Sequence, residues 1–161
     1  MLYLFSCLIL LTPKIDKDLL NMRAEYYQAI KSEEIAIKLD KELGAISNKT
    51  FLQMGYFGAN KMILAKFAFW PNAKYTLFVE GKTLLEEAIK SDRKNIELIF
   101  LRYPVQLNAP SLLDYNQNME IDRKTLISQV KSIKDEDLKT RILVFLLSEG
   151  KLTEVERKAI Q

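Results

Sequence analysis

Beyond residue 15, apolar residues recur every three or four positions, as they do along one face of an α-helix. The first such stripe consists of Leu19, Met22, Tyr26 and Ile30. Strict alternation of apolar and polar residues, which indicates a half-buried strand, is nearly absent. Only five glycines and four prolines interrupt the 161 residues, so the chain has few turns. The pattern predicts an all-α fold.

Residues 16–161 are expected to form a single helical domain of about six to eight helices, paired as antiparallel hairpins. The pattern leaves open whether residues 16–43 form one helix or two. Residues 49–70 are apolar nearly all round, so they are predicted to form the central, most buried helix, after an Asn48 cap. Small residues on this helix, Gly55 and Gly58, would allow a neighbouring helix to approach closely. Pro71 is expected to open the next helix.

Residues 1–15 form a separate apolar segment, with a ten-residue apolar run from Leu2 to Leu11. The run is too short to span a bilayer and has the length of a signal-peptide core, although no basic residues precede it. The letters LFSC also imitate a bacterial lipoprotein signal, with Cys7 as the acylated residue. We expect an exported protein, periplasmic or membrane-associated. The alternative is a cytoplasmic protein in which this segment is a first core helix or an apolar tail.

Composition excludes several chemistries. The chain has no histidine and a single cysteine, which excludes an internal disulfide, structural zinc and catalysis by Ser-His or Cys-His pairs. The glycines are scattered, so no phosphate-binding loop exists. The net charge of +3 is not concentrated in a basic stripe, and we expect no nucleic-acid partner. We therefore expect no catalytic residue of these kinds, no cofactor and no metal.

The segment DYNQNMEIDRKT, residues 114–125, imitates the start of a calcium-binding EF-hand loop, with oxygen-bearing side chains at alternate positions. Such a loop needs glycine at its sixth position and a bidentate glutamate at its twelfth. Met119 and Thr125 occupy these positions. A calcium site is therefore not expected.

The segment NIELIFLRYPVQLNAP, residues 95–110, has the pattern of a buried helix, yet it contains Arg102 and Pro104. Proline has no N–H to bond to the carbonyl of Phe100, which predicts a kink between Phe100 and Pro104 and a hinge at this point. An arginine is unfavourable to bury alone and needs a carboxylate nearby. Candidate partners are Asp114, Asp122 and the acidic residues of the predicted helix 74–90. We prefer a structural role, in which Arg102 acts as a clamp that fixes the following irregular segment against the helix, over a ligand-binding role.

The segment GKTLLEEAIKSDRKN, residues 81–95, has the small residue Gly81, the apolar Leu85, and then Ala88 and Ile89 before a polar turn. It resembles the second helix and following turn of a tetratricopeptide repeat. Arg93 stands where that family usually has proline. The family's Trp, Leu-Gly and Tyr pattern is replaced in the preceding helix by Ala65, Ala68, Phe69 and Asn72. The resemblance covers about one half-repeat and implies helical hairpins stacked in a tetratricopeptide-like arrangement.

From Tyr75 to about Asp122 the chain also resembles an uncharacterised family of exported bacterial helical proteins. This resemblance implies a helical fold and an exported location, and Pro104 departs from the family pattern. The features carried over are Gly81, Ala88, Glu97, Arg102, Pro110, Tyr115, Asn116 and Asp122.

Taken together, these patterns favour a non-catalytic, helical-repeat-like module that binds a protein or a peptide, because stacked helices present grooves to such partners. The alternative is an enzyme that uses carboxylates and an arginine, or a small-ligand-binding protein, with its site in the region 97–122. The candidate binding residues of that region are Arg102, Tyr115, Asn116 and Asp122. A membrane is expected as a partner only if residues 1–15 are retained.

Overall fold

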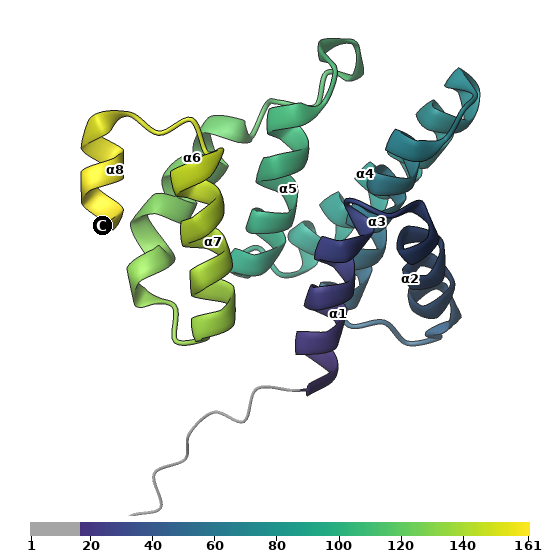
Figure 1. The fold of residues 1–161 in the computed structure, drawn as a ribbon, viewed down its shortest axis with the longest axis horizontal. Coiled ribbons are helices and arrows are strands. Elements are labelled where there is room, and N and C mark those ends of the chain that lie inside the picture. The colour runs from purple at the N-terminus through teal and green to yellow at the C-terminus, as the bar shows by residue number, and fades with distance from the viewer. Residues whose placement is uncertain (1–16) are drawn as a thin grey trace, which may run out of the picture.

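The computed structural model describes residues 17–161, and all regular structure in this range is helical (Figure 1). No strand occurs within it, which confirms the all-α prediction. The apolar segment at residues 1–15, with Cys7, lies outside the described residues. The α-helices are α1 (Lys17–Ala29), α2 (Glu33–Ala45), α3 (Phe51–Phe67), α4 (Pro71–Ser91), α5 (Ile96–Asn108), α6 (Met119–Gln129), α7 (Glu136–Ser148) and α8 (Glu154–Ile160), and the 3-10 helices are η1 (Ser111–Leu113) and η2 (Val130–Ser132).

Helix α5 lies in the middle of the molecule, with α1 to α4 on one side and α6 to α8 on the other (Figure 1). Helices α3 and α4 pack along each other, and α5 contacts α3, α4 and α6. Buried apolar side chains form one core, which extends from Tyr26 in α1 to Ile160 in α8. Stacking of the tetratricopeptide kind stays a prediction.

Side-chain caps fix where several helices begin. The Ser32 side chain accepts a hydrogen bond from the backbone N–H of Ile35, so residues 16–43 contain two helices rather than one. Helix α3 begins after Thr50, and the predicted Asn48 cap was therefore wrong by two residues. Thr50 has Gln53 three positions later, and the two residues cap each other's backbone N–H groups, an arrangement that favours the helix start. Helix α4 begins at Pro71, as predicted.

Helix α5, rather than α3, has the largest buried share. Eight of its 13 residues are buried, against seven of 17 in α3, so the prediction for residues 49–70 was wrong on this point. The physical reason is position, because α5 has neighbours on both sides. Helix α5 continues through Pro104 and ends at Asn108, and the side-chain amide of Asn108 donates to the Pro104 carbonyl oxygen at 2.8 Å. The helix is therefore continuous through the region of the predicted kink, and the kink itself stays a prediction.

Two glycines let the backbones of α3 and α4 approach each other. A Cβ atom on Gly58 would lie 2.6 Å from the carbonyl oxygen of Gly81 and 2.7 Å from the backbone nitrogen of Leu85. A Cβ atom on Gly81 would lie 2.6 Å from the Cγ of Met62. Only glycine leaves room for this crossing. The expectation that small residues permit a close helix approach is confirmed at Gly58.

We expect Gly58→Ala to lower the free energy of unfolding by about 1–3 kcal/mol, because the added methyl group forces the two backbones apart. Gly44→Ala is the matched control on α2, where the nearest atom to the new Cβ is 3.8 Å away. That substitution should stabilise the protein by about 0.5–1 kcal/mol, since alanine favours a helix over glycine. Urea unfolding of both variants measures the difference. Equal stabilisation of the two would contradict the close crossing.

Candidate functional site

Three of the four predicted site residues meet between α4, α5 and α6. The Arg102 guanidinium donates through Nε and Nη2 to the two carboxylate oxygens of Asp122, each at 2.7 Å. Its third nitrogen, Nη1, donates to Glu86 at 2.8 Å. Such forked, charge-assisted bonds are among the strongest polar contacts in proteins. Arg102 was expected to need a carboxylate, and of the candidate partners Asp122 and Glu86 supply it, whereas Asp114 is exposed and does not.

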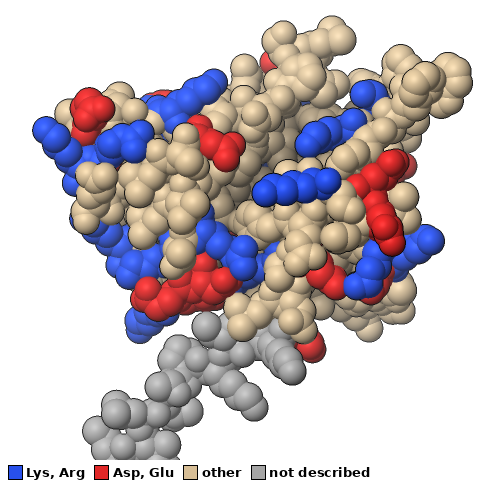
Figure 2. Space-filling model, in the orientation of Figure 1, with Lys and Arg blue, Asp and Glu red and all other residues tan. Residues whose placement is uncertain are grey.

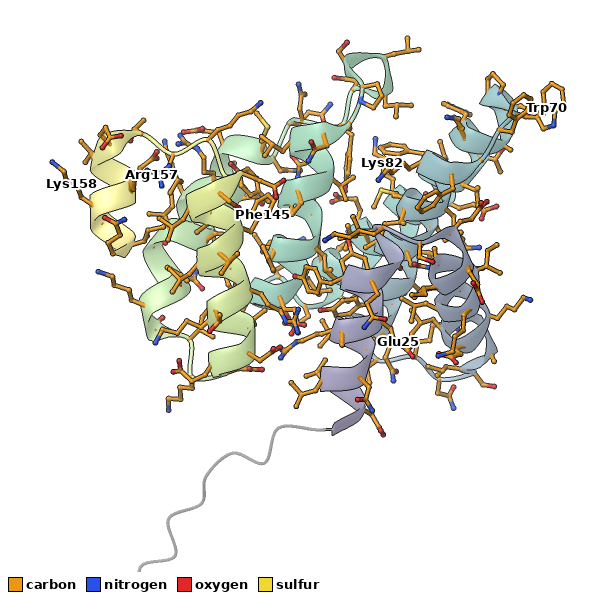
Figure 3. All side chains as sticks on the ribbon, viewed as in Figure 1. Glu25, Trp70, Lys82, Phe145, Arg157 and Lys158 are labelled. Carbon is orange, nitrogen blue, oxygen red and sulfur yellow. The ribbon has the colours of Figure 1, made fainter. Side chains whose placement is uncertain are left out.

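Two further side chains complete this cluster. The Tyr115 hydroxyl donates to the second oxygen of Glu86, and the Gln106 amide donates to Asp122 at 2.8 Å. Burial, together with the hydrogen bond to Glu86, holds the pKa of Tyr115 well above its ordinary value, so the phenol keeps its proton and stays a donor. The ammonium of Lys82, labelled in Figure 3, lies over the Tyr115 ring, 5.1 Å from its centroid.

The fourth predicted residue, Asn116, is not part of the cluster. Its side chain is exposed, and its backbone carbonyl accepts from the N–H of Met119 at 3.1 Å. Asn116 therefore belongs to the turn that leads into α6. The resemblance to exported bacterial helical proteins had named Asn116 together with Tyr115, but only Tyr115 is buried.

The geometry of the Arg102 cluster is that of a clamp. Arg102 is buried and Asp122 is only 1% exposed. Burial opposes the charged form of Arg102, but the hydrogen bonds and charge of Asp122 outweigh it and raise the pKa of the guanidinium. All three guanidinium nitrogens donate to carboxylates of the protein itself. The cluster ties the irregular segment and α6 to α4 and α5. A ligand-binding role of Arg102 would need a guanidinium nitrogen that no protein carboxylate holds, and all three are held.

A second buried cluster, which the sequence patterns did not single out as a site, is centred on Arg23 in α1. Its Nε and Nη2 atoms donate to the two oxygens of Glu97 in α5, at 2.6 and 2.7 Å. The Tyr56 hydroxyl of α3 donates to the same carboxylate at 2.6 Å. At the start of α7, Asp135 and Asp137 lie 2.8 and 3.2 Å from the Nη1 atom of Arg23. One arginine thus connects α1, α5 and α7.

The sequence does carry a signal for this second cluster. Arg23 lies four residues after Leu19 and three before Tyr26, on the apolar face of α1, and Glu97 is surrounded by apolar residues in α5. A charge on an apolar face indicates a buried ion pair, because burial of a lone charge is unfavourable. Burial and the negative charge of Glu97 raise the pKa of Tyr56 well above its ordinary value, so Tyr56 remains a hydrogen-bond donor.

A surface hollow of about 540 Å³ lies between α1, α2 and the start of α3, and we call it the α1–α3 groove. Three acidic residues, Asp18, Glu25 and Glu42, line it, and its lining includes no lysine or arginine. Glu25, labelled in Figure 3, pairs with Lys38 at 2.7 Å, and both side chains are partly or largely exposed. The apolar lining residues are Leu19, Met22, Leu39, Leu43, Ile46 and Leu52. The groove therefore combines an apolar lining with acidic groups.

No helix within residues 17–161 has both the length and the apolar character needed to cross a membrane. In the same range, no group of three or more cysteine, aspartate or glutamate side chains is placed to hold a metal ion.

The fold and the two clusters define an all-α protein whose buried ion pairs hold its helices together. No protein-family model, curated protein or solved structure matches the chain. The resemblances to tetratricopeptide repeats and to exported bacterial helical proteins therefore stay predictions.

Proposed function

We propose that this protein is a non-catalytic helical module that binds a peptide segment of a partner protein in the α1–α3 groove. The bound segment carries apolar side chains together with lysine or arginine. The observation that carries the proposal is the composition of the groove, which joins six apolar residues to three carboxylates and contains no basic residue. An amphipathic, cationic peptide would complement both properties.

The placement of the other charged groups supports this choice of surface. Both buried arginines are held by carboxylates of the protein, so their clusters stabilise the fold. Glu25 is held by Lys38 at 2.7 Å, whereas Glu42 is about half exposed and its ion pair with the same ammonium is long, at 3.5 Å. Exposed ion pairs of this kind are weak and exchange readily for a new partner. Glu42 is thus the carboxylate at which an incoming lysine or arginine can take the place of Lys38.

Fluorescence anisotropy of a labelled probe peptide tests the proposal. The probe is an 18-residue peptide of leucine and lysine with leucine at helical spacing, and a leucine-glutamate peptide of the same pattern is the charge control. We expect saturable binding of the leucine-lysine probe to the full chain at moderate salt. Glu42→Lys should weaken this binding about fivefold or more, because it places a positive charge at the groove edge.

Glu87→Lys is the matched control, since Glu87 is exposed on α4, outside the groove, and the change in net charge is the same. It should change the affinity less than twofold. Equal losses in Glu42→Lys and Glu87→Lys would mean that net charge alone attracts the probe. That result, or equal binding of the leucine-glutamate peptide, would overturn the groove as the binding surface.

A further inference from the structure

The connection between α3 and α4, together with the start of α4, carries exposed aromatic residues, which we call the aromatic tip and define as Phe69, Trp70 and Tyr75. These side chains are 82%, 66% and 62% exposed. Trp70 lies at the end of a projecting helical hairpin, as its label in Figure 3 shows. The rings of Phe69 and Trp70 contact each other edge to face, with centroids 5.0 Å apart. Large exposed aromatic groups gathered at one projection mark an interaction site.

From this surface we infer that the aromatic tip docks on an anionic lipid bilayer, with Phe69 and Trp70 entering the interface. Tryptophan and tyrosine are favoured at the boundary between lipid and water, because their rings are apolar and their N–H or O–H groups remain hydrated. Phenylalanine and tryptophan on a projection can enter the headgroup region without any rearrangement of the core. This inference is independent of the α1–α3 groove and of residues 1–15.

The charge around the tip selects a lipid surface of negative charge. Residues 43–79 contain no aspartate and no glutamate. Lys66 and Lys74 flank the tip and are exposed, although the Lys66 ammonium also donates to the carbonyl of Ile30 at 3.1 Å. Lysine beside interfacial aromatic residues is the combination that binds anionic lipids. An apolar protein partner would not need exposed lysines on both sides of the aromatic residues.

The shape of the molecule allows a flat surface to reach the tip. The turn between α5 and α6 projects on the same side of the molecule as the tip (Figure 1). In Figure 2 the ends of both projections are mostly tan, with only small patches of charged atoms. Leu112 in this turn is 92% exposed, and the exposed Asp114 follows it, so the turn adds apolar surface but no positive charge. The aromatic tip is therefore the principal contact.

The tip and the groove can act together. Helix α3 begins at the groove and ends at the tip, and its 17 residues separate the two by about 25 Å at the ordinary helical rise. A protein docked through the tip would hold the groove away from the bilayer, where a peptide can still enter.

Trp70 is the only tryptophan in the chain, so its fluorescence reports on the tip directly. The full-length protein is mixed with vesicles of phosphatidylcholine containing 30% phosphatidylglycerol and, separately, with vesicles of phosphatidylcholine alone. We expect a blue shift of the Trp70 emission with the anionic vesicles, and quenching by lipids brominated on their acyl chains. Vesicle co-sedimentation gives the partition coefficient in parallel.

Two variants test the tip, and the charge reversal has a matched control. Phe69→Ser removes an exposed ring while it retains the Trp70 probe, and it should lower the partition coefficient at least fivefold. Lys74→Glu should lower it by a similar factor or more, because each basic residue near an anionic surface strengthens binding about fivefold. Lys158→Glu, on α8 far from the tip in Figure 3, changes the net charge equally and should alter the partition coefficient less than twofold.

Each remaining outcome contradicts the inference. Co-sedimentation without a blue shift would place the lipid contact elsewhere, in residues 1–15 for example. If neither co-sedimentation nor a blue shift occurs, the tip binds a protein partner or has no partner. An equal blue shift with neutral vesicles would overturn the selection of anionic lipid. Peptide binding in the groove is measured without lipid, so either proposal can fail alone.

Discussion

Substitution of Arg23 by methionine is expected to lower the free energy of unfolding by about 3–5 kcal/mol, the loss usual when one partner of a buried ion pair is removed. Methionine keeps most of the side-chain volume, so the loss comes from the Glu97 carboxylate. That carboxylate stays buried and retains only the hydrogen bond from Tyr56. At this chain length the midpoint of thermal unfolding should fall by on the order of 10 °C. Urea unfolding and calorimetry measure the two quantities.

A double variant separates the effect of an unpaired charge from that of lost packing. Arg23→Met combined with Glu97→Leu removes both charges, and apolar pairs often replace buried ion pairs without loss. We expect the double variant to be more stable than Arg23→Met alone. Arg93→Met is the matched surface control, because Arg93 is exposed, and it should change stability by less than about 0.5 kcal/mol. Additive losses from the two single substitutions would contradict the pairing of Arg23 with Glu97.

Substitution of Arg102 by methionine is expected to cost a similar amount, about 3–5 kcal/mol. It leaves the buried Asp122 with the Gln106 amide as its remaining side-chain donor, and Glu86 with the Tyr115 hydroxyl. Arg102→Lys should lose less, since lysine retains the charge but not the two-pronged contact. Urea unfolding of both variants, with Arg93→Met again as the control, tests this order.

The result for Arg102 also separates a clamp from a ligand site. Residues that evolve to bind a ligand often reduce stability, and their removal leaves stability unchanged or raises it. Unchanged or increased stability in Arg102→Met would therefore contradict the clamp. Such a result would favour the alternative, an enzyme or a small-ligand-binding protein with its site in the region 97–122.

Local sequence signals predicted much of the fold because they act within one or two helical turns. Pro71 begins α4 as predicted, and the side chains of Ser32, Asp135 and Thr153, all of residue types that favour a helix start, cap backbone N–H groups three positions later. The Asn48 cap was wrong because a second capping residue, Thr50, lies two positions later. The burial of α5 exceeded that of α3 because burial depends on neighbours from distant parts of the chain. Spacing along a single segment does not contain that information.

The two arginine clusters and the α1–α3 groove show the same limit, because local spacing does not reveal contacts between distant segments. The sequence indicated that Arg102 needs a carboxylate, and Asp122 and Glu86 supply it. Arg23 and its partners span 114 positions between α1 and Asp137, so no local motif joins them. The α1–α3 groove was not predicted either. It is made by the ends of three helices, and its lining becomes apparent only once those helices are placed in space.

The most direct test of the proposed function is a map of the probe's contacts by nuclear magnetic resonance. The full chain, labelled with ¹⁵N, is titrated with the leucine-lysine peptide, and changes in amide chemical shift are followed residue by residue. We predict that the changes concentrate in α1, the end of α2 and the start of α3, and spare the amides around Arg102 and Tyr115. Changes centred on α5 and the segment before α6, with the groove unaffected, would contradict the account.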